Sequence, residues 1–64
     1  MNFKVVEKIV KADGWVLVRV TGSHYQYKKI GVAESLVIPY HGKKDISIGV
    51  MKNLENISGL SLRR

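Results

Sequence analysis

Cysteine is absent from this 64-residue sequence, and proline and tryptophan each occur once. Without cysteine the chain has no disulfide bridge and no thiolate metal site, and its two well-separated histidines do not supply the usual ligands of structural zinc. No apolar run approaches the ~20 residues that span a bilayer, and no signal-peptide pattern follows Met1. These absences predict a cytoplasmic protein that uses no metal, no other cofactor and no membrane.

Residues 1–64 are expected to form a single domain, because so short a chain buries only about 60% of the surface that its unfolded form exposes. Eleven Lys and Arg residues against five Asp and Glu residues give a net charge of +6. A charge of this size attracts polyanions or an acidic partner protein. The same charge can equally belong to a solvated surface that keeps a small domain soluble. The positions of the basic residues have to distinguish a binding surface from a solvated one.

Apolar residues recur at helical spacing in two segments, which predicts an amphipathic helix near each end of the chain. The first covers residues 2–12, with its first residue as the N-cap and Gly14 in the left-handed position beyond its last turn. The second starts near Ser47 and stops at Gly59, and residues 61–64 are expected to be a frayed tail. Its expected buried stripe consists of Ile48, Val50, Met51, Leu54 and Ile57.

Three segments rich in β-branched and aromatic residues are expected to be strands: residues 15–20, 25–30 and 34–39, the last ending at Pro39. Two turns can join the first pair. In the favoured one, Val20 and Thr21 make a type I turn followed by Gly22 in the left-handed region, which glycine adopts readily. In the other, a two-residue type I′ loop forces Thr21 to positive φ and sets Arg19 opposite His24.

In either register, alternation places His24, Gln26 and Lys28 in a row on one face of the sheet. Tyr25 and Tyr27 lie on the other face, which packs on the helices, while the row faces solvent. The order helix, three strands, helix predicts an α+β two-layer domain with a three-stranded antiparallel sheet and both helices on one face. Double-stranded RNA-binding domains share this topology, although a fold alone implies no function.

His24 is the candidate for proton transfer near neutral pH, because it lies on a strand beside a small Gly-Ser turn that leaves room for a polymer. In metal-free RNA cleavage a general base takes the 2′-OH proton, the oxygen attacks the adjacent phosphate, and cations stabilise the phosphorane. His41 is a candidate second proton donor or phosphate contact, since it shares a loop with Lys43 and Lys44. Ordinary solvated histidines are the simpler interpretation of both.

Several short fragments are spread over nearly the whole chain: Asp13-Gly14-Trp15, Leu17-Val18-Arg19, Gly22-Ser23-His24, Tyr27, Val37-Ile38-Pro39, His41, Lys44-Asp45-Ile46, Ile48-Gly49, Leu54 and Gly59-Leu60. Each is weak alone, but their order and spacing resemble the HicA family of small bacterial toxins, also called YcfA-like. The resemblance implies a fold like that of double-stranded RNA-binding domains, ribosome-independent cleavage of mRNA, and His24 as the catalytic histidine. It also implies a HicB-like antitoxin as protein partner.

Three positions depart from the family pattern. Val50 and Lys52 stand where a threonine and an arginine are common, and Tyr27 stands where phenylalanine is common. The main hypothesis is a metal-independent endoribonuclease toxin with His24 as general acid/base. The residues expected to hold RNA are Gln26, Lys28, His41, Lys43 and Lys44. The alternative is a non-catalytic RNA-binding or partner-binding module with the same basic face.

Overall fold

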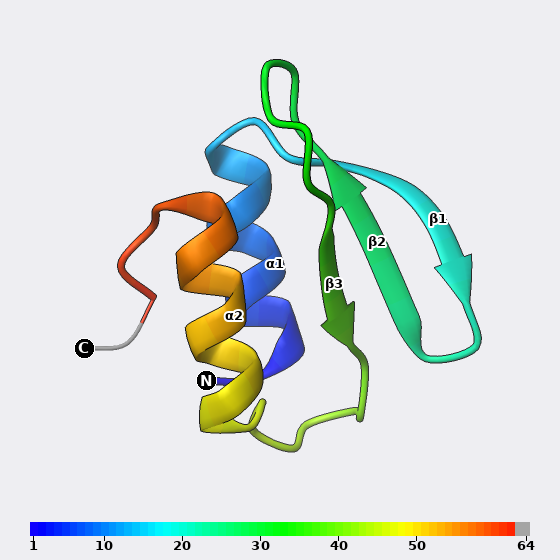
Figure 1. The fold of residues 1–64 in the computed structure, drawn as a ribbon. Coiled ribbons are helices and arrows are strands. Elements are labelled where there is room, and N and C mark those ends of the chain that lie inside the picture. Colours follow the sequence, from blue (N-terminus) through cyan, green and yellow to red (C-terminus); the bar gives the residue numbers. More distant parts are fainter. Residues whose placement is uncertain (63–64) are drawn as a thin grey trace.

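The computed structural model describes residues 1–62, which form two helices and three strands. The elements follow in the order α1 (Phe3–Ala12), β1 (Val16–Thr21), β2 (His24–Lys28), β3 (Leu36–Pro39) and α2 (Ile48–Ser58). The strands form an antiparallel sheet in the order β1-β2-β3, with both helices on the same side of it (Figure 1). The predicted α+β architecture is confirmed.

Both helices begin and end at the residues that the sequence indicated. The side chains of Asn2 and Ser47 each accept a hydrogen bond from the backbone N–H three residues further on, at 3.1 and 3.4 Å. Beyond the helix ends, Gly14 and Gly59 take φ values of +100° and +73°, which residues with a Cβ avoid. These local signals fix the length of each helix.

The β1–β2 turn differs from both registers considered above. Thr21 pairs with His24, so the loop consists of Gly22 and Ser23 alone. Gly22 has φ +58° and Ser23 a negative φ, a combination that fits a type II′ turn with glycine in the first central position. Both expected turns were wrong because a glycine beside a small polar residue suits this third turn equally well.

One extra residue in β1 changes the register between β1 and β2 in the part of the hairpin away from the turn. Leu17 pairs with Tyr27 but Arg19 pairs with Gln26, so Val18 forms a β-bulge. Because directly paired residues point to the same face, Arg19 lies with Gln26 on the face turned away from the helices, here called the outer face. The predicted assignment of residues to faces in β2 is confirmed, since Tyr27 is fully buried and the residues on either side of it are not.

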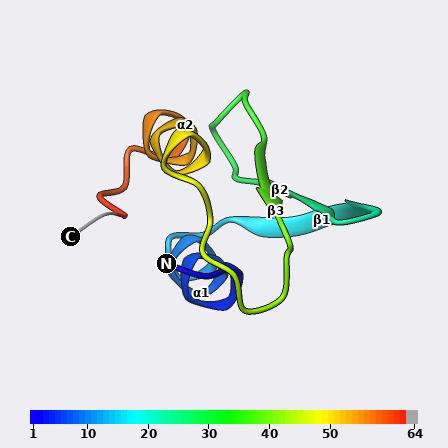
Figure 2. The ribbon, with the colours of Figure 1, turned by 90° about the horizontal axis from the view of Figure 1, so that it is seen from below.

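The core lies between the sheet and the helices and consists of Phe3, Val6, Val10, Trp15, Tyr27, Leu36, Ile38, Ile46, Met51, Leu54 and Leu62. Trp15 is 1% exposed. The loop from β3 to α2 passes the start of α1 (Figure 2), where the Ile46 N–H donates to the Met1 carbonyl at 2.8 Å. This loop therefore ties the N-terminal residue to the segment that leads into α2.

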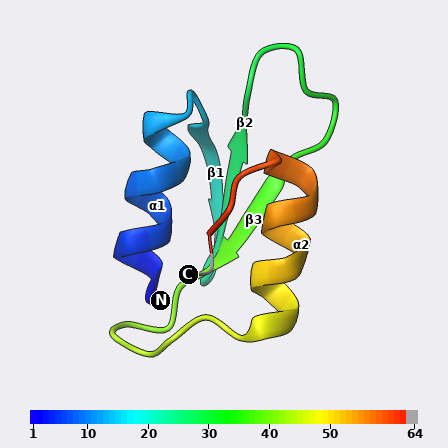
Figure 3. The ribbon, with the colours of Figure 1, turned by 90° about the vertical axis from the view of Figure 1, so that its left-hand side faces the viewer.

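Two expectations about the second helix and its tail were wrong. Ile48, the first residue of α2, is 64% exposed, whereas the rest of the expected stripe packs on the core: Met51 and Leu54 are buried, and Val50 and Ile57 are partly buried. Leu62, expected in a frayed tail, is 1% exposed and its N–H donates to Glu55 Oε2 at 2.9 Å. Figure 3 shows this segment returning between the two helices, where Leu62 completes the core. The rest of the expected tail, residues 63–64, lies outside the described residues.

Candidate functional site

His24 is the first residue of the central strand β2 and is exposed, as predicted. Its backbone is held on both sides, since it pairs with Thr21 of β1 and Pro39 of β3. Gln26 and Lys28 follow on the same face, so the predicted row exists. Gln26 is only half-exposed, and its Nε2 donates to Ser35 Oγ at 3.1 Å. The imidazole is thus presented to solvent from a fixed backbone.

His41 is positioned by contacts that connect the end of β3 to the β1–β2 turn. The Tyr40 N–H donates to the Ser23 carbonyl at 2.7 Å, directly beside His24. The Tyr40 ring makes an edge contact with Phe3 at 5.0 Å between centroids and lies 5.9 Å from Tyr25. This aromatic cluster holds the loop against α1, and the loop then turns sharply. His41 is the residue directly after Tyr40, which these contacts hold in place.

The two histidines border the same depression in the surface, here called the histidine pocket. It lies where the β3 edge of the sheet meets α2 and has a volume of about 440 Å³. Its lining residues are His24, Val37, Pro39, His41, Gly49, Val50 and Asn53. The sequence identified both histidines as candidates, and the structure brings them to one site.

The three predicted lysines are not gathered at the histidine pocket. Lys28 lies four residues along β2 from His24, about 13 Å at the usual strand rise of ~3.3 Å per residue. Lys43 lines a separate depression beside Asn2 at the start of α1. Lys44 is exposed in the same loop. The predicted RNA-binding residues therefore spread along a surface and do not form one cluster.

Arg19 is a basic residue of the outer face that is not among the residues expected from the sequence to hold RNA. Its pairing with Gln26 places it between His24 and Lys28 along the hairpin, and it is exposed. The two-residue turn sets this placement, because Thr21 pairs with His24 and Arg19, two residues before Thr21, therefore pairs with Gln26. Of the two turns considered from the sequence, only the two-residue type I′ loop placed Arg19 beside the row, opposite His24, and the observed turn differs from both.

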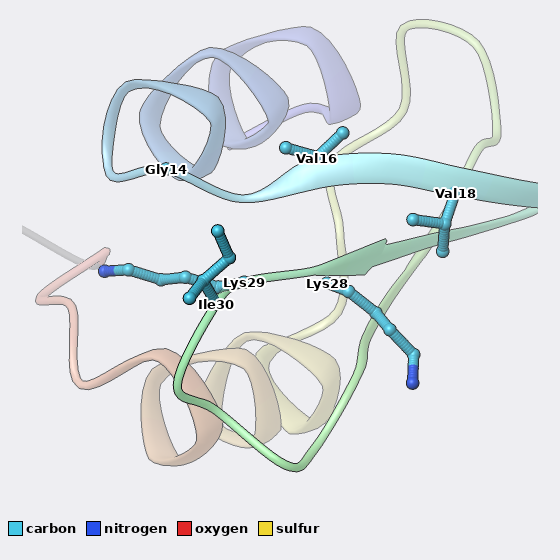
Figure 4. A pocket seen from close by; sticks show the side chains of 6 residues that line it. All are labelled: Gly14, Val16, Val18, Lys28, Lys29 and Ile30. Atoms are coloured by element: carbon cyan, nitrogen blue, oxygen red, sulfur yellow. The ribbon is translucent and has the colours of Figure 1, made fainter.

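An aliphatic patch occupies the other end of the hairpin (Figure 4). Val16, Val18 and Ile30 are 61%, 53% and 100% exposed, and together with Lys28 they line a depression of about 540 Å³. Lys29 also lines this depression; its Nζ lies 2.8 Å from Asp13 Oδ2, and this hydrogen bond holds the pKa of Asp13 below its usual value. Exposed aliphatic side chains gathered in this way are typical of protein interaction surfaces.

Within residues 1–62, no three His, Asp or Glu side chains come together as ligands for a metal ion. Neither helix in that range has the length and apolar character needed to cross a bilayer. The titratable side chains that line the histidine pocket are the imidazoles of His24 and His41. A pair of imidazoles can supply a general base on one side of a reacting group and a general acid on the other.

A sequence model of the HicA toxin of bacterial toxin–antitoxin systems matches residues 3–60 of the chain. The match spans all five elements of the fold and every residue of the histidine pocket. No curated protein matches the chain.

Proposed function

The chain belongs to the HicA family of bacterial toxins, and from that premise we propose that it is an endoribonuclease that cleaves mRNA and is inhibited by an antitoxin. The observation that carries the proposal is the histidine pocket. An exposed imidazole on a fixed strand shares this pocket with a second imidazole from an anchored loop. The net charge of +6 favours the approach of a polyanion.

The proposed reaction is an internal transesterification. His24 removes the proton from a ribose 2′-OH, and the 2′ oxygen forms a bond to the adjacent phosphorus. The bond from phosphorus to the 5′ oxygen then breaks, and His41 gives that oxygen a proton. The products are a 2′,3′-cyclic phosphate and a 5′-hydroxyl, so no water is consumed in this step. Each imidazole is expected to contribute roughly 10²–10⁴-fold to the rate.

The basic residues outside the pocket hold the RNA backbone in this proposal. The backbone of Lys28 lies about 13 Å along β2 from that of His24, at ~3.3 Å per residue. Lys28 is therefore expected to contact a phosphate further along the strand, with Arg19 between the two. Lys43 and Lys44 follow His41 in the same loop and are expected to provide positive charge for the RNA there. Loss of such contacts weakens RNA binding and its dependence on salt more than it slows the chemical step.

The test is cleavage of a labelled single-stranded RNA in the presence of a chelator. The wild-type protein is expected to cleave it, and the His24→Ala and His41→Ala variants are each expected to be slower by about 10²–10⁴-fold. Lys28→Ala should mainly raise KM, with Lys8→Ala as the control because Lys8 is exposed on α1. Equal cleavage by wild type and His24→Ala would refute the assignment. Binding without cleavage by the wild type would favour a non-catalytic RNA-binding module.

The aliphatic patch is the part of the outer face proposed to bind a HicB-like antitoxin. Val16, Val18 and Ile30 expose apolar surface that a protein partner would bury, and a partner bound there would also obstruct the hairpin along which RNA runs. Val18→Asp and Ile30→Asp should abolish the complex with the product of a neighbouring antitoxin gene, measured by calorimetry, while RNA cleavage persists. Val5→Asp is the control, since Val5 is 44% exposed on α1. Tight binding by both patch variants would place the antitoxin elsewhere.

A further inference from the structure

We propose that the histidine pocket is a nucleobase subsite, which holds one unpaired base of a single-stranded RNA next to the scissile phosphate. The inference rests on the proposed function for its ligand class, RNA. It goes further by stating which part of the RNA enters the pocket and which side chain reads it.

The composition of the pocket favours a base over a phosphate. None of its seven lining residues is Lys or Arg, although the chain has 11 such residues. A phosphate group bound there would lack the charged donors that phosphate sites use. A base is uncharged and planar, and it can lie against aliphatic carbon surface while its edge makes hydrogen bonds. The lysines of the surrounding surface remain available for the backbone.

The aliphatic side of the pocket comes from three side chains. Val37 projects from the outer face of β3 and is 44% exposed, although its neighbours Leu36 and Ile38 are fully buried. Pro39 and Val50 complete this side from the end of β3 and the first turn of α2. The volume of about 440 Å³ lies within the range of roughly 300–1,000 Å³ usual for small-molecule sites. The face of a base can cover this apolar surface.

Asn53 supplies the polar edge of the pocket. It is exposed on α2, and its carboxamide offers both a hydrogen-bond donor and an acceptor. The edges of bases present donors and acceptors in the same paired manner, so an amide can discriminate between bases. His24 and His41 border the same pocket, so a base read by Asn53 would determine which phosphate meets the imidazoles.

Gly49 keeps the pocket open. It lies in α2 at an ordinary helical φ, and a Cβ at this position would meet no atom within 4 Å. Glycine is therefore not needed here for the backbone, and a helix is more stable with alanine at such a position. Because Gly49 lines the pocket and the space beside it is open, we expect a larger side chain at position 49 to narrow the pocket. This makes it possible to fill the pocket without straining the fold.

The cleavage arm of the test uses a mixed-sequence single-stranded RNA and sequencing of the cut sites. Asn53→Ala is expected to change the distribution of cut sites, with preference for the favoured base reduced by about 5- to 100-fold. Asn56→Ala is the matched control, because it removes the same side chain from an exposed position of α2 outside the pocket. Gly49→Leu is expected to lower kcat/KM for every RNA. Unchanged cut sites in Asn53→Ala together with unchanged kcat/KM in Gly49→Leu would overturn the inference.

The binding arm separates this inference from the proposed catalysis. The wild-type parent and its variants are titrated into a fluorescein-labelled single-stranded RNA and into its duplex, both 2′-O-methylated so that they cannot be cleaved, with thermal unfolding as the check that each protein is folded. Single-stranded RNA should bind more tightly than duplex, and Gly49→Leu should remove that difference. This result supports the subsite even if the wild type cleaves nothing. Equal binding of single strand and duplex by the parent would refute it even if the wild type is an active nuclease.

Discussion

The hydroxyl of Tyr27 connects the sheet to helix α1, and removing it provides a sharp test of the packing described above. Tyr27 is 0% exposed in β2, and its hydroxyl donates a hydrogen bond to Glu7 Oε2 in α1. Tyr27→Phe keeps the buried ring and deletes only this bond. The substitution is therefore free of the cavity effects that accompany larger truncations.

The expected loss of stability follows from the nature of the acceptor. Hydrogen bonds to charged groups contribute about 1.5–3 kcal/mol. The Glu7 side chain is 22% exposed and lies 3.5 Å from Lys11 Nζ, so its carboxylate keeps water and a cation when the hydroxyl is removed. We therefore expect the lower end, about 1.5 kcal/mol. For a domain of this size that corresponds to a decrease in Tm of roughly 6–12 °C.

Urea unfolding at neutral pH measures this change, with the fluorescence of the single buried tryptophan, Trp15, as the signal. A double-mutant cycle with Glu7→Gln isolates the coupling between the two side chains. Tyr40→Phe is the control, because Tyr40 is 41% exposed, and we expect it to change stability by less than about 0.5 kcal/mol. Wild-type stability in Tyr27→Phe, or a coupling near zero, would refute the role of this hydrogen bond.

The same contact predicts a dependence on alkaline pH. Burial, reinforced by the hydrogen bond to Glu7, raises the pKa of Tyr27 far above its ordinary value of 10.0. The folded state therefore holds this proton more tightly than the unfolded state, and the resulting stability is present below pH 10 and decreases as pH rises beyond it. Because Tyr27→Phe has no proton to lose here, its stability should decrease less steeply above pH 10 than that of the wild type. Parallel curves would contradict this assignment.

Three further predictions concern single positions. Gly59→Ala should cost about 1–2 kcal/mol in urea unfolding, because φ is +73° at this helix end and a Cβ is disfavoured there; an unchanged midpoint would contradict the left-handed cap. Leu62→Ala should destabilise by about 2–5 kcal/mol, whereas Ile48→Ala should stay within about 0.5 kcal/mol, since the first is 1% and the second 64% exposed. Similar losses at both would show that the segment after α2 is not packed. The hydrogen bond from Lys29 lowers the pKa of Asp13, so its stabilising effect is present above pH 3.8 and is lost as pH falls through the lower folded value. Asp13→Asn should remove this part of the acid dependence of Tm, and an unaltered acid profile would count against the pair.

The helices could be predicted from the sequence because their signals are local. Asn2 and Ser47 cap the helix starts and Gly59 ends α2 through contacts within a few residues of the chain. The hairpin register could not be predicted in the same way, because Gly22 is compatible with several turns and the extra residue at Val18 shows only when two strands are paired. The faces of β2 were nevertheless correct, since alternation does not depend on the turn.

The candidate site was predictable in part for the same reason. The exposure of His24 follows from its alternation with buried Tyr27, and the structure confirms it. Its proximity to His41 depends on the Tyr40 anchor, a contact between segments 17 residues apart that no local pattern encodes. Leu62 and Ile48 were misjudged because burial at the ends of a helix depends on how the chain returns to the core. The roles of the predicted site residues in RNA binding and catalysis stay predictions.

The bulge in β1 has a consequence for the behaviour of the protein at high concentration. β1 is an edge strand of the three-stranded sheet, so one side of its backbone carries hydrogen-bonding groups that β2 does not use. At a regular edge with exposed valines, a second copy of the chain could pair its own edge strand with β1, and repeated pairing of this kind would form a fibril. Val18 breaks the regular spacing of these groups, and the charge of Arg19 follows at once. A variant that lacks Val18 would present a regular edge and should aggregate at concentrations where the wild type stays monomeric.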